Sequence, residues 1–259
     1  MIHDEILSCN DLTLKVGPRQ LVRDLSLTLY SQQLTVLLGP NGTGKSSLLN
    51  ALSGTHQTYQ NIRLFGKPMP DWCRSRLARR LSVLPQSSQL TFGFSVRQVV
   101  ELGGLPLQLT YKECRNRAQQ MMQKVGILHL AERSYPTLSG GEKQRTHLAR
   151  VLLQLSDDSQ SRLLMLDEPT SALDLAHQHQ CLQLARKLTR EGVGVLMVLH
   201  DLNLAAQYAD RILLLDQGLI QADGSPAEVL TATQLSRVYG CPITVANHPT
   251  LGVPQVYAA

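Results

Sequence analysis

The feature that most constrains the fold is a series of four short apolar runs, each followed by a polar or glycine-rich group. The runs cover residues 34–38, 81–84, 163–166 and 195–199. Continuous apolar runs separated by helical patterns are typical of parallel strands buried on both faces of a sheet. Ligands bind beyond the carboxyl ends of such strands, so we expect the groups that follow the runs to converge on one site. These groups are Gly39, Gln86, Asp167 with Glu168, and His200.

The N-terminal part of the chain has a different pattern, in which apolar and polar residues alternate. Segments 11–16 and 25–29 show this alternation, and Gly17-Pro18 between them is a turn signal. A period of two is typical of strands with one face in water. We therefore expect an antiparallel β subdomain here, beside the mostly parallel core sheet of an α/β fold.

Residues from about 87 to 160 are mostly helical in pattern. Ser95 and Gln98 have the spacing of a capping box at a helix start, and Gly103-Gly104 is expected to end that helix. The expected organisation is a single domain over residues 1–259, with a core of residues 1–86 and 161–259 and a helical subdomain of about 87–160.

Composition and charge exclude several classes of protein. No apolar stretch approaches the roughly 18 residues of a membrane-spanning helix, and the N-terminus lacks the basic and apolar pattern of a secretory signal. The five cysteines form no C-x-x-C pair, which favours reduced thiols over disulfides or a zinc site. The net charge of +5 is dispersed along the chain, so a solvated surface explains it without a nucleic-acid partner. We expect a protein that stays in the cytoplasm.

Residues 39–46 match the P-loop pattern G-x-x-x-x-G-K-[ST], between an apolar run and a helical stretch over 47–52. Glycines let backbone N–H groups close around phosphate oxygens at the positive end of a helix. Lys45 is expected to contact the β and γ phosphates of a nucleotide, and the Ser46 hydroxyl to bind Mg²⁺. The predicted nucleotide-binding residues are Gly39, Pro40, Asn41, Gly42, Thr43, Gly44, Lys45, Ser46 and Ser47.

Phosphoryl transfer at a P-loop also needs a second acidic group for the metal and a group that activates water. Asp167 ends a buried run, where it is expected to hold Mg²⁺ through water, although it would also suit a turn before Pro169. Glu168 is placed to polarise the attacking water as general base, and His200 to contact the γ-phosphate. The predicted catalytic residues are therefore Glu168, His200 and Lys45.

Residues 138–145 read Leu-Ser-Gly-Gly-Glu-Lys-Gln-Arg. Ser139 and Glu142 have the spacing of another capping box, so a well-capped helix is the simplest explanation. That explanation does not account for Gly140 and Gly141, because each helical glycine costs roughly 0.5–1 kcal/mol relative to alanine. The glycines instead favour a close approach of the backbone to an anion.

In order and spacing, these motifs resemble the nucleotide-binding subunits of ABC transporters over essentially the whole chain. The resemblance implies an ATPase that forms a head-to-tail homodimer, with each ATP and its Mg²⁺ between the P-loop of one copy and residues 138–144 of the other. It implies that Gln86 belongs to a Q-loop and that 171–174 form a D-loop at the dimer seam. The implied contacts to the partner's ATP are Ser139, Gly140, Gly141, Glu142 and Asp174, and the implied metal-binding residues are Ser46, Gln86 and Asp167. Val16 stands where the family usually places an aromatic residue that stacks on adenine.

The cargo is inferred from resemblance alone. Segment 91–103 is similar to the equivalent region of ABC importers of iron chelates, cobalamin and haem. Segments 174–180, 198–206 and 224–230, with the tail around His248-Pro249, look most like the ATP-binding subunits of haem importers. The resemblance implies an ATPase at the cytoplasmic face of the inner membrane, bound to a polytopic permease that a periplasmic haem-binding protein supplies. Import of a ferric siderophore or of cobalamin is the nearest alternative. A soluble ABC-type ATPase acting on nucleic acid or ribosomes is an alternative of another class.

One basic run has no role in this scheme. Trp72, the only tryptophan, lies among Arg74, Arg76, Arg79 and Arg80. Such a run is suited to a phosphate or to a membrane partner, but a solvated helix is the better explanation.

Overall fold

The computed structural model describes residues 4–17, 19–55, 61–86, 93–157 and 160–258. Its centre is a six-stranded sheet in the order β10-β9-β3-β8-β7-β6, in which only β10 runs antiparallel to its neighbour. The strands are β3 (Leu34–Leu38), β6 (Leu81–Leu84), β7 (Arg162–Asp167), β8 (Val193–Val198), β9 (Arg211–Asp216) and β10 (Leu219–Gly224). Every residue of β3, β7 and β8 is buried. The mostly parallel core sheet predicted from the apolar runs is confirmed.

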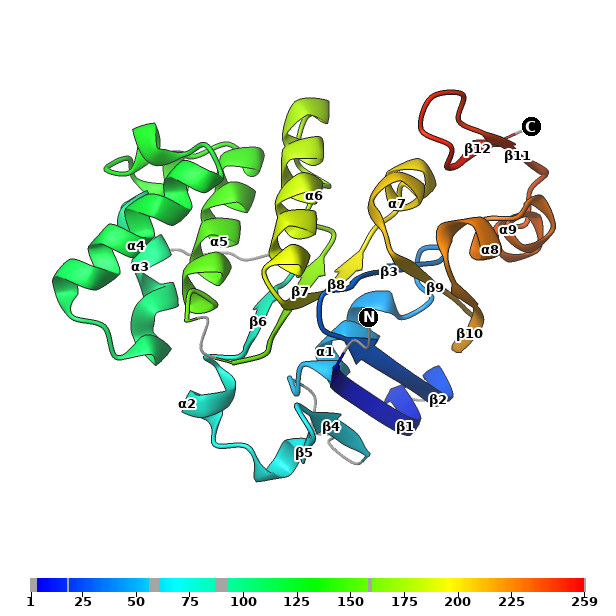
Figure 1. Ribbon diagram of the computed structural model, residues 1–259, viewed down its shortest axis with the longest axis horizontal. Helices are drawn as coiled ribbons and strands as arrows, with labels where there is room; N and C mark the ends of the chain where they lie inside the picture. The colour runs from blue at the N-terminus through cyan, green and yellow to red at the C-terminus, as the bar shows by residue number, and fades with distance from the viewer. Residues whose placement is uncertain (1–3, 18, 56–60, 87–92, 158–159, 259) are drawn as a thin grey trace.

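A second, antiparallel sheet of four strands has the order β2-β1-β4-β5. Its strands are β1 (Glu5–Val16), β2 (Arg19–Tyr30), β4 (Ile62–Leu64) and β5 (Lys67–Pro68). Both long strands extend beyond the alternating segments of the sequence, and bulges interrupt their register. The apolar face of this sheet shares one hydrophobic cluster with α1 (Lys45–Leu52) and one face of the central sheet (Figure 1). The predicted antiparallel β structure at the N-terminus is confirmed.

Most of the remaining helices share a hydrophobic cluster with the opposite face of the central sheet. α3 (Val96–Glu101), α4 (Tyr111–Lys124) and α5 (Gly140–Gln154) gather beside β6, while α6 (Leu175–Arg190) and α7 (Leu202–Tyr208) lie over the middle of the sheet (Figure 1). The capping box of Ser95 and Gln98 at the start of α3 is confirmed. The short elements between these helices are η2 (Leu102–Leu107), η3 (Leu128–Leu130) and η4 (Tyr135–Thr137).

The predicted role of Gly103-Gly104 as a helix stop is wrong. α3 already ends at Glu101, and the chain continues through both glycines as the 3₁₀ helix η2. The glycines serve close packing instead, because a Cβ atom on Gly103 would lie 2.1 Å from the carbonyl oxygen of Arg150 on α5.

The C-terminal part adds α8 (Pro226–Val229), α9 (Ala232–Tyr239) and a hairpin of β11 (Ile243–Asn247) and β12 (Pro254–Ala258). Asn203 on α7 fixes this hairpin, since its side chain accepts from the Val256 amide at 2.7 Å and donates to the Val256 carbonyl at 3.2 Å. Two further short helices, η1 (Met69–Asp71) and α2 (Arg74–Leu77), precede β6. Within the described ranges, no helix combines the length and apolar character needed to cross a bilayer.

The packing at Gly103 gives a first prediction. We expect Gly103→Ala to lower the free energy of unfolding by about 1–3 kcal/mol, because the added methyl group has to displace the backbone of α5. Denaturant unfolding followed by circular dichroism measures the change. Gly93→Ala is the matched control, since its added methyl group would meet no atom of a more distant residue within 4 Å and its backbone conformation is an ordinary one. An unchanged midpoint for Gly103→Ala would contradict the packing argument.

Candidate nucleotide site

The structure brings the predicted polar groups together at one edge of the central sheet. Gly39, Asp167 and His200 follow or end the neighbouring strands β3, β7 and β8, and Gln86 follows β6. Hydrogen bonds and an ion pair then join Ser46 to Asp167, and Gln86 and His200 to Glu168. The expected convergence beyond the carboxyl ends of parallel strands is therefore present.

Two glycines shape the P-loop between β3 and α1. Gly39 has a φ of 151°, and a Cβ atom there would lie 2.0 Å from the carbonyl oxygen of Leu215. Gly44, at the start of α1, has a φ of 96° and lies against Leu21 of β2. Residues that carry a side chain rarely adopt either of these backbone conformations, so the path of the loop depends on glycine at both positions.

Lys45 carries a charge that the loop almost completely buries. Lys45 is 5% exposed, and its Nζ donates to the carbonyl oxygens of Gly39 and Pro40, both at 2.8 Å. Burial lowers the pKa of Lys45, an effect that the nearby carboxylates of Glu168 and Asp167 oppose. The ammonium group is thus held in the loop that is predicted to surround phosphate.

Ser46 and Asp167 form the part of the site that suits a metal ion. The Ser46 hydroxyl donates to Oδ1 of Asp167 at 3.1 Å, and Asp167 is 3% exposed. Burial raises the pKa of Asp167, although the hydrogen bond from Ser46 opposes the shift. A hydroxyl and a carboxylate oxygen are the hard donors that Mg²⁺ prefers, and a cation would stabilise this buried carboxylate. The residues present therefore fit Mg²⁺, and the side-chain oxygen of Gln86 is a further donor at the same edge.

Glu168 lies between two polar side chains. Its Oε2 accepts from Nε2 of Gln86 at 2.8 Å, and its Oε1 forms an ion pair with Nε2 of His200. The backbone of Glu168 has a φ of 50°, which non-glycine residues adopt at a cost. Its carbonyl oxygen accepts from the amide and hydroxyl of Ser171, at 3.3 and 3.0 Å, and its amide donates to Val198 at 3.2 Å. These contacts hold the carboxylate at the sheet edge.

The segment 138–145 opens α5 as the sequence predicts. Ser139 and Glu142 form a complete capping box, and the hydrogen bonds from Ser139 lower the pKa of Glu142. Ser139 and Gly140 are exposed. Among the hydrogen bonds that the structure describes, none joins this segment to residues 39–46 of the same chain. The segment reaches the site within its own chain through Gln144, whose side chain donates to the Glu168 carbonyl at 3.5 Å.

Gly141 has a structural reason that the sequence did not reveal. A Cβ atom there would lie 3.0 Å from the carbonyl oxygen of Ala172, in the segment 171–174. Asp174 ends that segment and caps α6, because its Oδ1 accepts from the backbone amide and from Nδ1 of His177, at 2.9 and 2.7 Å. These hydrogen bonds lower the pKa of Asp174. The two segments thus pack together at the starts of α5 and α6.

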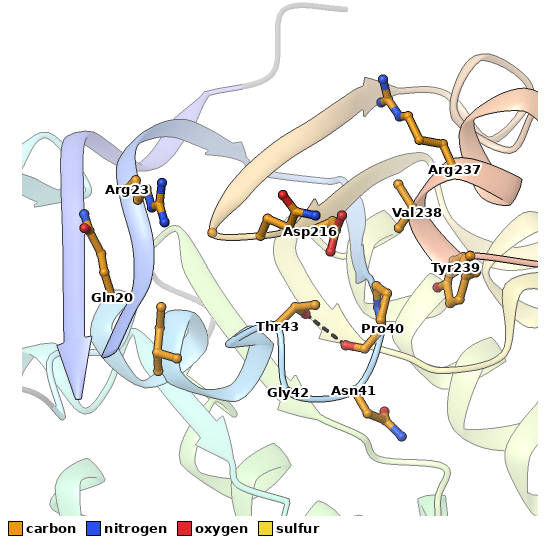
Figure 2. Close-up of a pocket in the computed structure, with 14 residues that line it drawn as sticks. Gln20, Arg23, Pro40, Asn41, Gly42, Thr43, Asp216, Arg237, Val238 and Tyr239 are labelled. Atoms are coloured by element: carbon orange, nitrogen blue, oxygen red, sulfur yellow. Dashed lines mark hydrogen bonds between the residues drawn. The ribbon is translucent and has the colours of Figure 1, made fainter. Parts of the chain in front are cut away.

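A cavity of about 500 Å³ lies beside the P-loop (Figure 2). Gln20 and Arg23 of β2 line one side of it, and Arg237, Val238 and Tyr239 of α9 line the other. Sequence reasoning missed α9, whose Tyr239 has its pKa raised to about 12 by burial, against a hydrogen bond from the backbone of Gly39. Contact with Gly39 links the C-terminal region to the P-loop.

Val16, at the end of β1, does not line this cavity and is 56% exposed. Its exposed position leaves it free to contact a base, but it offers no aromatic ring for stacking.

Comparison with known proteins identifies the family. The sequence profile described as "ABC transporter" matches residues 22–171. The chain belongs to the ABC transporter family. It is 53% identical over 253 residues to the "Hemin import ATP-binding protein HmuV" of Aliivibrio fischeri, with 98% of this chain and 97% of the relative aligned. The protein of the same description from Vibrio cholerae is 52% identical over 250 residues, with 96% of each chain aligned.

Solved structures agree with this assignment. A metal-chelate type ABC transporter in an inward-facing conformation matches with a TM-score of 0.81 and 26% identity, covering 99% of this chain and 98% of the other. CbiO1 from Clostridium perfringens, part of the ABC transporter complex CbiONQ, matches with a TM-score of 0.74 and 26% identity, covering 90% and 94%. The predicted family, fold class and enzyme class of a transport ATPase are confirmed, and ATP binding follows from them.

The geometry around Glu168 gives a second prediction. We expect Glu168→Gln to lower the rate of ATP hydrolysis by about 10²–10⁴-fold, because an amide cannot accept the proton of the attacking water. ATP affinity should stay within a few-fold, since Lys45 and the P-loop are unchanged. Phosphate release and equilibrium ATP binding measure the two effects. Glu5→Gln removes an exposed carboxylate on β1 and should change neither, whereas full hydrolysis by Glu168→Gln would exclude this carboxylate as the base.

Proposed function

We propose that this chain is the ATP-hydrolysing subunit of a haem importer and works as a head-to-tail homodimer beneath a membrane permease. The observation that carries the proposal is the contact of Ser46 with Asp167 and of Gln86 with Glu168 beside the P-loop, in a chain that aligns over 98% of its length with a hemin import ATP-binding protein. A periplasmic haem-binding protein then supplies the permease, and the chain lies at the cytoplasmic face of the inner membrane.

The P-loop binds the triphosphate. The first turn of α1 contains no acidic residue, so the positive end of this helix faces the phosphates without internal compensation. Lys45 exchanges its two neutral carbonyl acceptors for oxygens of the β and γ phosphates, which are stronger acceptors because they are charged. Mg²⁺, when bound, neutralises phosphate charge, and Ser46 and Asp167 are the residues that hold it.

Glu168 removes the proton from the attacking water. Its two carboxylate oxygens are held by Gln86 and by His200. In our proposal, the attacking water takes the place of one of these partners. In our proposal Gln86, which is exposed just after β6, is the partner that leaves, while His200 keeps the carboxylate oriented beside the γ-phosphate.

A second copy of the chain completes the site. Ser139 and Gly140 are exposed at the start of α5, a helix of 15 residues whose N-terminus carries partial positive charge. A two-fold pair of subunits can present each such helix start to the γ-phosphate on the opposite P-loop. Gly141, Glu142 and Asp174 lie in the same packed region and accompany Ser139 to the partner's ATP.

A groove lined in part by β6 is the proposed binding site for a segment of the permease. It has a volume of about 750 Å³ and includes Trp72, Leu77, Leu81 and Val83. Leu81 and Val83 belong to the strand that leads to Gln86. A cytoplasmic segment of the permease in this groove would contact that strand directly. The region after Gln86, with the helix over 95–104, is a second candidate surface for the permease, and residues 87–92 of that region lie outside the described part of the chain.

The shared site gives a third prediction. We expect Ser139→Arg to abolish ATP-dependent dimerisation of the Glu168→Gln protein, because a long cationic side chain would fill the space for the γ-phosphate. ATP should still bind each monomer through the P-loop. Size-exclusion chromatography with light scattering measures the dimer, and Asn116→Arg adds the same charge at an exposed position of α4 as the control. Dimers of unchanged stability would contradict the shared-site arrangement.

The cargo gives a fourth prediction. In proteoliposomes with the cognate permease, haem-loaded binding protein should raise ATP hydrolysis several-fold over the haem-free binding protein. The Glu168→Gln subunit in the same assembly provides the control for coupled hydrolysis. Stimulation by a binding protein loaded with a ferric siderophore or cobalamin, and not with haem, would overturn the proposed cargo but leave the assignment as a transport ATPase intact. Co-purification with ribosomes or DNA, and not with a permease, would overturn the transport assignment.

A further inference from the structure

A cavity of about 420 Å³, separate from the nucleotide site, is lined by guanidinium groups. Arg76, Arg79, Arg80 and Arg162 line it together with Trp72 and Asp157. Of the described lining residues, only Asp157 carries a negative charge, so positive charge is in excess. We refer to this cavity as the arginine pocket.

The arginine pocket lies at the opposite edge of the sheet from ATP. Arg80 directly precedes β6 and Arg162 begins β7, so both stand at the amino ends of parallel strands. The P-loop, Asp167 and Glu168 stand at the carboxyl ends of the same sheet. A ligand in the arginine pocket therefore does not belong to the nucleotide site.

Two of the guanidinium groups are fixed in place before a ligand binds. The guanidinium carbon of Arg80 lies 3.8 Å from the centre of the Phe65 ring and 5.4 Å from that of Trp72. Nε of Arg80 donates to the Ser161 carbonyl at 2.9 Å, and Nε of Arg79 donates to the Pro106 carbonyl at 2.7 Å. These bonds use the Nε atoms, and no hydrogen bond within the described part of the chain uses the terminal nitrogens of Arg79 and Arg80.

Arg162 is the most buried of the four, at 9% exposure. Its terminal nitrogens donate to the carbonyl oxygens of Leu155 and Glu191, at 2.9 and 3.1 Å, and among described residues its buried Nε has no hydrogen-bond partner. These acceptors are neutral, and no ion pair of this buried arginine with a carboxylate is found among the described residues. Such a charge is costly, and a bound anion would lower that cost.

We propose that the arginine pocket binds a phosphate-bearing anion. Planar guanidinium groups bind phosphate through paired hydrogen bonds, and several of them here surround one cavity. Asp157 disfavours highly charged anions near its side of the pocket, but four guanidinium groups outweigh one carboxylate. The volume exceeds that of a single phosphate ion and leaves room for its ester substituent. The phosphate belongs to an anionic lipid headgroup or to a small soluble phosphate compound.

The test uses the full-length protein with ADP and Mg²⁺ filling the nucleotide site. One arm measures flotation with phosphatidylcholine vesicles that contain or lack phosphatidylglycerol, and the other measures pyrophosphate binding by titration calorimetry. We expect the double variant Arg76→Gln, Arg79→Gln to weaken binding at least about tenfold in whichever arm the wild type binds, because it removes two charge-assisted contacts. Binding to the anionic vesicles alone identifies a lipid headgroup, and binding of pyrophosphate identifies a soluble phosphate.

Arg115→Gln is the control, because it removes the same charge from an exposed position on α4. The variants should keep the wild-type affinity for ATP, which shows that they are folded. If the wild type bound neither probe, or if Arg115→Gln weakened binding as much as the single variant Arg76→Gln, the proposal would be overturned.

Discussion

The nucleotide site depends on a positive charge that the fold buries before phosphate arrives. Lys45 is 5% exposed, and two neutral carbonyl oxygens, of Gly39 and Pro40, accept its hydrogen bonds. Neutral acceptors compensate only part of the cost of removing an ammonium group from water. A triphosphate compensates much more, because it brings several charges to the same place. The loop can keep this arrangement without a ligand because Gly39 adopts a φ of 151° against the backbone of Leu215.

Much of the fold could be predicted from the sequence because the decisive signals are local. An apolar run followed at once by a polar group identifies both a buried strand and its carboxyl end, and parallel strands place those ends at one edge. The interactions of Ser46 with Asp167, and of Glu168 with Gln86, are long-range contacts that follow from this one regularity. Capping boxes are equally local, and those at Ser95 and Ser139 are both present.

Features that depend on packing between distant segments could not be predicted. The prediction for Gly103 failed for this reason, because the close backbone of Arg150 requires a glycine there, and the end of the local helix does not. Gly141 likewise packs against the carbonyl of Ala172. Tyr239, far along the chain, accepts a hydrogen bond from the backbone of Gly39. The arginine pocket also brings together residues about 80 positions apart in sequence, such as Arg80 and Arg162, and no local sequence pattern predicts such a contact.

The short strand β6 connects the two regions that the proposals concern. Arg80, Leu81 and Val83 place its start and middle beside the arginine pocket and the groove, and Gln86 follows its end. A strand of four residues spans only about 13 Å. β6 is paired with β7 along its length, so a shift of the whole strand would carry Gln86 and Glu168 together. In the proposed importer, a permease segment in the groove therefore has to move Gln86 itself, which lies beyond the paired residues, to open its hydrogen bond to Glu168. Transport and hydrolysis are then coupled at this bond.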